Sequence, residues 1–361
     1  MNYLTSVRRS TLEIFPDELF LELFSFIQPV DLYRAFRHLN QRLTRILHDI
    51  YICMHITSDD DDELHHECLN YFSRQIIYLA IDCHPTRLLY EIDLRPFSNL
   101  RSLHLPLPTD EQCSQITPKN FPFLTQLTIH NNGYGSIVFG SNSFPYLVAC
   151  CIPQIYPDYE RTMRPCVTLR SLQLGSCSLQ YLLRILPHAP NLTYLDVCLQ
   201  SSEAQITETD WKHEKLSHLK IKIRKLVPDF EILLKTVPNL SRLEFLWNES
   251  SVDRYNRKSF DFTLFSSLLR ASLSPLFKRL DIDIHVPKCD ENISDIHEID
   301  PVWFSRLSKI NIISHDYSFF LTTRKLVTNA DNALTTSLLQ STYVTRRNAR
   351  FNRIKLDKTP K

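Results

Sequence analysis

Histidine and cysteine residues flank an acidic run near the N-terminus, and both residue types can bind zinc. The run covers residues 59–63, and the nearby candidate ligands are Cys53, His55, His65, His66 and Cys68. Zinc sites usually draw their ligands from pairs spaced C-x₂₋₄-C or H-x₃₋₅-H, and these five residues form no such pair. We therefore interpret residues 57–69 as an acidic, solvated linker and predict no metal site.

The sequence also lacks the motifs that carry common catalytic chemistry. It contains only four glycines in 361 residues, and they are too scattered to build a Gly-rich phosphate-binding loop. It has no CxxC pair, no HExxH motif and no nucleophile elbow. We therefore predict that the protein is not an enzyme, has no catalytic residues and needs no cofactor.

Composition and charge favour an ordinary globular protein inside the cell. The 41 basic and 40 acidic residues leave a formal net charge of +1, which gives no general attraction to nucleic acids or acidic membranes. Residues 1–9 contain no apolar signal segment, and no apolar run approaches the length of a membrane span. We expect a cytoplasmic or nuclear location, with the ten cysteines reduced.

The elements that position side chains recur at a regular interval. The pattern apolar-x-x-apolar-x-apolar begins at Ile76 and returns at intervals of 24, 24, 23, 22, 23, 24 and 24 residues. These copies begin at Leu100, Leu124, Leu147, Leu169, Leu192, Leu216 and Leu240. Two later copies begin at Phe277 and Leu307, after gaps of 37 and 30 residues. Several copies are preceded by a Pro-Asn or Pro-aromatic pair, such as Pro190-Asn191 and Pro145-Tyr146.

The apolar spacing within each repeat predicts a short strand, which in some copies is followed by a helix. The last apolar positions alternate, so Leu195 and Val197 point to one side of a strand and Asp196 to the other. Apolar residues at helical spacing lie between strands, at positions 179, 182, 183 and 186 and again at 230, 233, 234 and 237. A unit of about 23 residues cannot bury its own apolar face, so neighbouring units must stack side by side.

This repeat resembles the leucine-rich-repeat family over about residues 70–315. The resemblance implies an α/β fold, an irregular solenoid with a parallel sheet on its concave face, although the Asn or Cys that usually follows the strand is mostly missing. The outward strand residues would then line the binding face. From these we predict a target-binding set: His104, Thr128, Gln173, Tyr194, Asp196, Lys220, Lys222, Arg242 and Glu244. Their mixed charge favours a protein or peptide ligand over a nucleic acid.

Residues 12–50 have a different, helical pattern. Pro16 is well placed to begin a helix, with Asp17 and Glu18 in its first turn. The apolar residues that follow cover most of the helix circumference, and so short a segment cannot cover both sides. We therefore predict that another molecule covers the second side.

The N-terminal segment resembles an F-box. The resemblance is carried by residues 15–27, by Pro29, by Asp31-Leu32 and by Leu39, whereas Leu43 stands where the family usually has an aromatic residue. It implies a three-helix unit that binds a Skp-type adaptor and, through it, a cullin ubiquitin ligase. The adaptor-binding residues implied in this way are Phe15, Pro16, Leu19, Phe20, Leu23, Phe24, Ile27 and Leu32.

Together these patterns predict four regions. They are an F-box at residues 10–56, the acidic linker at 57–69, a solenoid at 70–330, and a C-terminal cap with a basic tail at 331–361. The predicted function is target recognition in a Skp–cullin–F-box ubiquitin ligase. The N-terminal helices could instead merely cap the array. Two alternative functions also stay open: a repeat scaffold without a ubiquitin role, and a nucleic-acid binder acting through the tail and a basic patch at Lys220.

Overall fold

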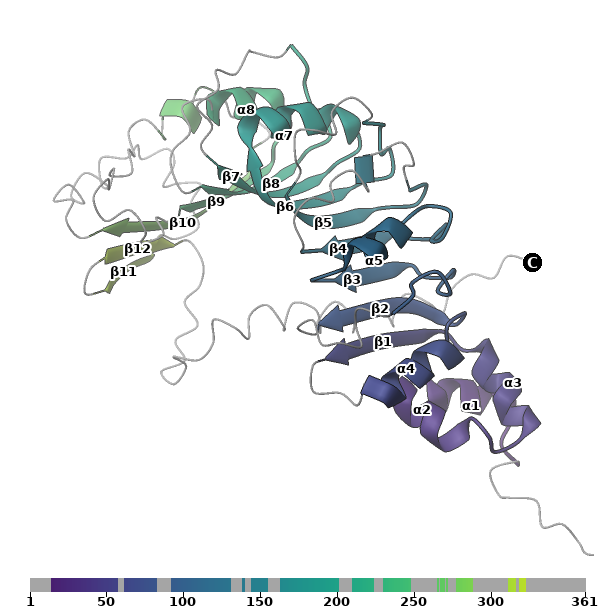
Figure 1. Cartoon of the computed structure of the whole chain (residues 1–361). Helices are drawn as coiled ribbons and strands as arrows, with labels where there is room; N and C mark the ends of the chain where they lie inside the picture. Colours follow the sequence, from purple (N-terminus) through teal and green to yellow (C-terminus); the bar gives the residue numbers. More distant parts are fainter. Residues whose placement is uncertain are drawn as a thin grey trace, which may run out of the picture. The chain divides into compact units, whose positions relative to one another are not determined.

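A computed structural model describes the chain over most of residues 14–322 (Figure 1). The described residues are 14–57, 62–82, 92–130, 138–139, 144–154, 163–200, 210–223, 230–247, 265, 267–269, 271, 277–287, 311–315 and 318–322. All of them belong to one compact unit. The predicted C-terminal cap and tail at 331–361 lie outside the described residues.

Three short helices open the described part of the chain: α1 (Asp17–Phe24), α2 (Pro29–Phe36) and α3 (Gln41–Asp49). Pro16 is the N-cap of α1 rather than its first residue, and Asp17 and Glu18 lie in the first turn as predicted. Asn40 caps α3 by accepting a hydrogen bond from the backbone N–H of Leu43 at 2.8 Å. Thus proline and capping residues set where these helices begin.

The sheet that follows is long and mostly parallel (Figure 1). Ten strands pair in sequence order, each parallel to the next. They are β1 (Ile52–Thr57), β2 (Ile76–Asp82), β3 (Ser102–Leu105), β4 (Gln126–Ile129), β5 (Ala149–Gln154), β6 (Ser171–Ser178), β7 (Tyr194–Gln200), β8 (His218–Ile223), β9 (Arg242–Trp247) and β10 (Arg279–Pro287). The α/β class with a parallel sheet is therefore confirmed.

Rows of apolar side chains cross this sheet, and one of them runs through eight strands. Strand register aligns Leu103, Leu127, Cys150, Leu172, Leu195, Leu219, Leu243 and Leu280 as direct neighbours, and all are buried. The repeat spacing explains the row, because each copy places its second apolar residue at the same register position. Fully burying one such side chain contributes about 1.5–3 kcal/mol relative to leaving it exposed.

The helices between strands cover the apolar face. They are α5 (Asp110–Gln115), α7 (Leu179–Ile185) with the 3₁₀ turn η4 (Leu186–His188), and α8 (Phe230–Thr236). Figure 1 shows α7 and α8 side by side over the same face of the sheet. Both predicted helical stripes are confirmed, since Leu179, Leu182 and Leu233 among them are completely buried.

In three repeats an asparagine side chain ties the turn before the strand to the turn of the preceding repeat. The side-chain amide of Asn191 donates to the carbonyl of Val167 at 2.7 Å, and Asn99 and Asn239 make the equivalent bonds to Arg74 and Glu214, both at 2.8 Å. The Pro-Asn lead-in seen in the sequence therefore has a structural role, because it satisfies a carbonyl that no strand ladder reaches.

The structure corrects two predicted boundaries near the N-terminus. Residues 62–71 form a helix, α4 (Asp62–Tyr71), and its Cys68 and Leu69 are buried, so much of the predicted linker is part of the core. The sheet also begins earlier than predicted: β1 lies inside the region assigned to the F-box and pairs in parallel with β2. The short alternation of Ile52, Met54 and Ile56 carried that signal.

The last predicted repeat also differs from expectation. The copy at Leu307 was predicted to add another parallel strand, but β11 (Asn311–His315) pairs only with β12 (Ser318–Thr322), antiparallel, and β12 pairs antiparallel with β10. β11 and β12 are only two residues apart in the sequence, whereas a parallel pair needs a connection of a dozen or more residues.

One close backbone approach in the sheet yields a test. A Cβ atom at Gly175 would lie 2.6 Å from the carbonyl oxygen of Pro153, so we expect Gly175→Ala to lower the free energy of unfolding by about 1–3 kcal/mol. The neighbouring Ser176 is the matched control, since its buried hydroxyl has no partner among the described residues. Ser176→Ala should be neutral or slightly stabilising in urea denaturation. Equal stability of the two variants would contradict the close approach.

Candidate protein-binding surfaces

Helix α1 is apolar on two sides, and only one side is covered. Phe20 and Phe24 are 2% and 1% exposed, whereas Leu23 and Phe26 are 48% and 80% exposed. We call the exposed residues on the Leu19–Leu23 side of α1 and on its flanks the N-terminal apolar patch; it consists of Ile14, Phe15, Leu19, Leu23 and Phe26. Uncovered apolar side chains gathered on one short helix and its flanks are typical of an interaction site.

The covered side of α1 is held by rings and charges from α2 and α3. The ring centroids of Phe20 and Phe24 lie 5.6 Å apart, and Phe24 packs against Phe36 of α2 at 4.8 Å. Asp17 pairs with Arg42 at 2.6 Å and with Arg45 at 3.0 Å, and these arginines hold the pKa of the Asp17 carboxyl below its usual value. The side of α1 that remains exposed is therefore fixed by the helices packed behind it.

Because of this packing, some of the predicted adaptor-binding residues are exposed and the others are buried. Phe15, Pro16, Leu19 and Leu23 are exposed, and Ile27 is partly buried. Phe20, Phe24 and Leu32 are core residues, because they fill the space between the helices and cannot contact a partner while that core is packed. Phe26, the most exposed residue of the patch, was not among the predicted contacts, although its helical spacing from Leu19 and Leu23 had indicated it.

Helix α4 connects the N-terminal helices to the sheet. The hydroxyl of Tyr33 in α2 donates to Glu67 of α4 at 2.8 Å, and Arg37 donates to the same carboxylate oxygen at 3.0 Å. The hydrogen bond from Tyr33 is the main reason that the pKa of Glu67 is lowered. At the start of β2, the side-chain amide of Gln75 lies 2.7 Å from Nδ1 of His48 in α3.

The predicted target-binding residues share one face of the sheet, which we call the polar face. Strand register aligns one row of side chains on this face across β3–β10: His104, Thr128, Cys151, Gln173, Asp196, Lys220, Glu244 and Asp281. Tyr194, His218, Arg242 and Arg279 form the adjacent row, and Lys222 lies beside Cys198. The common face predicted for these residues is confirmed, and their binding of a target stays a prediction.

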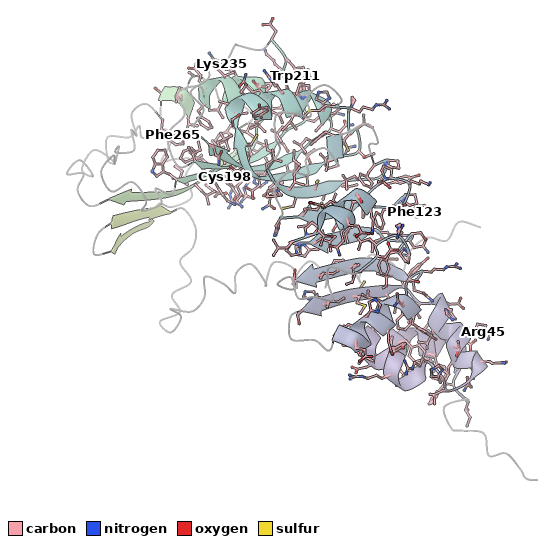
Figure 2. All side chains as sticks on the ribbon, viewed as in Figure 1. Arg45, Phe123, Cys198, Trp211, Lys235 and Phe265 are labelled. Carbon is pink, nitrogen blue, oxygen red and sulfur yellow. The ribbon has the colours of Figure 1, made fainter. Side chains whose placement is uncertain are left out.

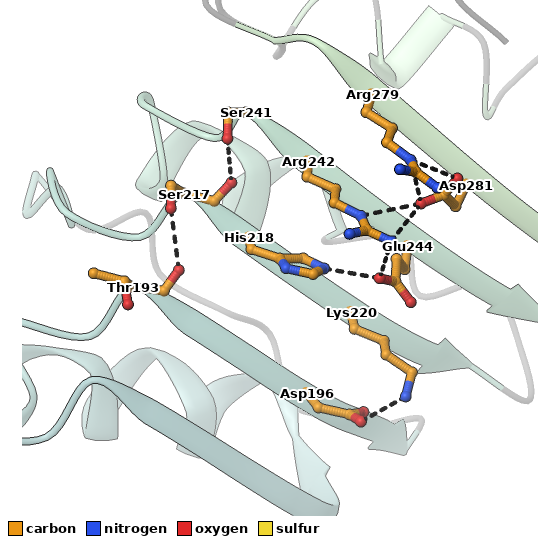
Figure 3. Close-up of polar contacts among 10 residues, drawn as sticks. All are labelled: Thr193, Asp196, Ser217, His218, Lys220, Ser241, Arg242, Glu244, Arg279 and Asp281. Carbon is orange, nitrogen blue, oxygen red and sulfur yellow. Dashed lines mark hydrogen bonds and ion pairs between the residues drawn. The ribbon is translucent and has the colours of Figure 1, made fainter. Parts of the chain in front are cut away.

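Many charged residues of the polar face are paired with each other (Figure 3). Lys220 donates to Asp196 at 2.8 Å. Arg242 contacts both Glu244, at 2.7 Å, and Asp281, at 2.9 Å, and it links β9 to β10. His218 contacts Glu244 at 2.9 Å, and Arg279 contacts Asp281 at 2.9 Å. The sequence could not show the pairs that join different strands, Lys220–Asp196, His218–Glu244 and Arg242–Asp281, because their members are 24, 26 and 39 positions apart.

The carboxylates of this network lie beneath the cations. The side chain of Asp196 is only 4% exposed, against 20% for Lys220 and 43% for Lys222, which lies 3.7 Å from the same carboxylate. Asp196 is therefore covered rather than available to a target, which corrects the prediction for that residue. The hydrogen bond from His218 lowers the pKa of Glu244, with Arg242 and Lys220 acting in the same direction and burial opposing them.

A second polar cluster lies on the same face over β1–β5. Asp82 accepts from Nε2 of His55 at 2.7 Å and from Nε2 of His104 at 2.8 Å, and the ring of His130 packs against His104. Burial lowers the pKa values of His104 and His130 and raises that of the neighbouring Cys151 thiol to about 11. Cys151 is thus a protonated thiol at neutral pH and a poor nucleophile.

A search for metal-binding geometry within the described ranges finds no group of three or more His, Cys, Asp or Glu side chains that could hold an ion. The described part of the chain also contains no helix with the length and apolarity needed to cross a bilayer. Comparison with models of known protein families finds no match to this sequence, and comparison with curated protein sequences finds none either.

The buried carboxylate of Asp196 predicts unequal roles for its two lysines. We expect Lys220→Met to lower the free energy of unfolding by about 1–3 kcal/mol, because it removes the close partner of a buried charge. Lys222→Met is the matched control and should cost about 0.5 kcal/mol or less, since its ammonium is more distant and better solvated. Urea denaturation of both variants measures the difference, and equal losses would contradict the assigned pairing.

The lowered pKa of Glu244 predicts a pH dependence. A carboxyl group whose pKa is lower in the folded state stabilises the fold above its unfolded value of about 4.3, and this contribution is lost as the pH falls through the folded value. Glu244→Gln should therefore be less stable than the wild type at pH 7, by about 1–2 kcal/mol, and the gap should narrow as the pH falls below about 4.3. Glu214→Gln, at an exposed carboxylate, is the control and should show no such gap. A gap of the same size at pH 7 and at pH 3 would contradict this assignment.

Proposed function

We propose that this protein is the target-recognition subunit of a Skp–cullin–F-box ubiquitin ligase. In this proposal, residues 10–56 contain an F-box that binds a Skp-type adaptor. The sheet and helices from residue 70 onward form an irregular leucine-rich-repeat-like solenoid that binds a target protein. The protein performs no chemistry of its own, and it would act inside the cell, where the ligase subunits are.

The N-terminal apolar patch carries the proposal. Leu19 and Leu23 are exposed on α1 and Phe26 is exposed just after its end, whereas Phe20 and Phe24 of the same helix are already packed in the core. A helix of this kind needs a second covering surface to remove its remaining apolar area from water. The F-box resemblance of residues 15–27 identifies the covering partner as a Skp-type adaptor.

The connection through α4 supports a role in positioning. The Tyr33–Glu67–Arg37 contacts and the parallel pairing of β1 with β2 join the N-terminal helices to the sheet without an intervening flexible linker in the described residues. An adaptor bound at the helices and a target bound at the sheet would then share one scaffold. Holding both raises the effective concentration of the target's lysines at the ubiquitin-carrying enzyme.

The decisive variants lie in the N-terminal apolar patch. We expect Leu23→Glu and Phe26→Glu to abolish co-purification with a co-expressed Skp-type adaptor, because each places a charge in the contact. Since both side chains are exposed, circular dichroism and the urea midpoint should stay within error of the wild type. Phe20→Glu is unsuitable for this test, because it places a charge in the core and is expected to unfold the helices.

Leu107→Glu is the matched control, since Leu107 is similarly exposed but follows β3 outside the patch. It should retain the adaptor. Retained binding by Leu23→Glu and Phe26→Glu would contradict the proposal. A chain that is monodisperse alone and never captures the adaptor would instead support the alternative, a repeat scaffold without a ubiquitin-ligase role.

A further inference from the structure

A second group of exposed apolar side chains lies at the edge of the sheet from which β4, β5 and β6 start. Phe123, Tyr146, Val148 and Val167 are between 43% and 56% exposed. Figure 2 marks Phe123 at this edge. We call these four residues, with Arg101 and Arg170, the amino-edge strip. It belongs to neither the N-terminal apolar patch nor the polar face.

Backbone hydrogen bonds place the members of the strip side by side. The N–H of Thr125 donates to the carbonyl of Arg101, that of Val148 to Thr125, and that of Arg170 to Val148, each at 2.8 Å. Neighbouring strands in such a ladder lie about 4.8 Å apart. Phe123 and Tyr146 occupy equivalent positions, one residue before the leucine that opens each repeat. The apolar side chains are therefore consecutive along the edge, with Arg101 and Arg170 at its two ends.

The two aromatic residues stand at a position where three repeats use asparagine for structure and two others have Thr168 and Lys215. Asn99, Asn191 and Asn239 occupy this position in their own turns and donate to the preceding turn. Phe123 and Tyr146 have no side-chain amide and cannot make that bond. These two turns therefore lack the stabilising amide hydrogen bond and expose an aromatic ring to water. The stability of the fold alone does not explain this combination.

The charge around the strip has a single sign. The turns that lead into β3–β6, residues 96–101, 119–125, 144–148 and 163–170, contain four cations and no acidic residue. The cations are Arg101, Lys119, Arg164 and Arg170, and all are exposed. Arg170 donates one guanidinium N–H to the carbonyl of Asn191 at 3.0 Å, and the Arg101 guanidinium lies 6.0 Å from the centroid of the Tyr51 ring. Neither arginine has a carboxylate within ion-pair distance among the described residues. On the polar face, in contrast, arginines and lysines are paired with buried carboxylates.

We propose that the amino-edge strip is a docking site for a polypeptide segment whose apolar side chains are flanked by acidic residues. Phe123, Tyr146, Val148 and Val167 would receive the apolar side chains, and Arg101 and Arg170 would pair with carboxylates at either end. Aromatic residues and arginine are the side chains that most often dominate the energy of protein interfaces. This inference does not depend on adaptor binding or on any ubiquitin-ligase role.

A peptide fits the strip better than a nucleic acid. Single strands bind through stacking on aromatic rings and through cations along the backbone. Half of the apolar residues here are valines, which offer no ring for stacking, and the aromatic residues are confined to two adjacent turns. Aliphatic side chains interleaved with aromatic ones suit an apolar peptide, and cations at the two ends suit flanking carboxylates.

The asparagines of the other turns supply variants that preserve the fold. Phe123→Asn with Tyr146→Asn should allow the inter-turn bond to form, to the carbonyls of Ser98 and Pro122, so the unfolding midpoint should be unchanged or higher. The same pair removes both rings and should weaken peptide binding by about tenfold or more. A second variant, Arg101→Glu with Arg170→Glu, should weaken binding of acidic peptides by a similar factor and abolish its salt dependence.

The probe is a displayed library of random peptides of about twelve residues, selected on the immobilised full-length chain and retested as labelled peptides. Only peptides that still bind Leu23→Glu are scored, which excludes binding at the N-terminal apolar patch. We expect apolar peptides with acidic flanks, bound by the wild type and by the control Leu107→Ser. Their binding should be weakened by both strip variants, and replacing their acidic residues with lysine should reduce it.

Three outcomes would overturn the inference. The selection could enrich no acidic-flanked apolar peptide, or the strip variants could bind such peptides as tightly as the wild type. Alternatively, labelled poly-uridine RNA could bind the wild type and be lost in both strip variants while peptides are unaffected, which would assign the strip to single-stranded nucleic acid. None of these results bears on the adaptor test, because the N-terminal variants and the strip variants alter different residues.

Discussion

The structure depends on the stacking of apolar rows across the parallel sheet. No single repeat can bury its own leucines, because a strand and its connection together present too little surface to cover them. The row from Leu103 to Leu280 exists only when neighbouring strands lie in register, and register in turn requires the same apolar position in every copy. The other features of the described chain follow from satisfying this one constraint.

One consequence is a difference between the two faces of the sheet. The apolar face is closed by α7, α8 and the turns, whereas the other face carries charged residues on adjacent strands about 4.8 Å apart. At that spacing unpaired charges of one sign would repel, and the cross-strand pairs of Lys220 with Asp196 and of Arg242 with Asp281 remove that repulsion. The polar face is therefore stabilised by its own charges, and its mixed composition is not by itself evidence of a ligand.

The apolar groups left exposed have two different physical origins. In the N-terminal helices, three short elements provide too little surface to cover both sides of α1, so Leu23 and Phe26 remain in water while Phe20 and Phe24 fill the core. At the amino edge of the sheet there is no such shortage, because equivalent turns use asparagine to bond to their neighbours. There, Phe123 and Tyr146 expose aromatic rings at a position where the fold also accepts a polar residue.

By itself, the sequence determined the repeat interval, the strand alternation and the helical stripes, because each depends on a spacing of two, three or four residues within one element. It therefore predicted that Leu195 and Val197 face inward, and that Lys220 and Glu244 share a face. It also predicted that α1 is apolar on two sides.

Only the tertiary structure decided which side α1 buries, since that depends on where Phe36 and Arg42 pack. The inclusion of α4 in the core and the covering of Asp196 by its lysines were decided in the same way. Both result from contacts between segments distant in the chain, which no local pattern encodes, whereas the alternation in β1 and the short separation of β11 and β12 are local features.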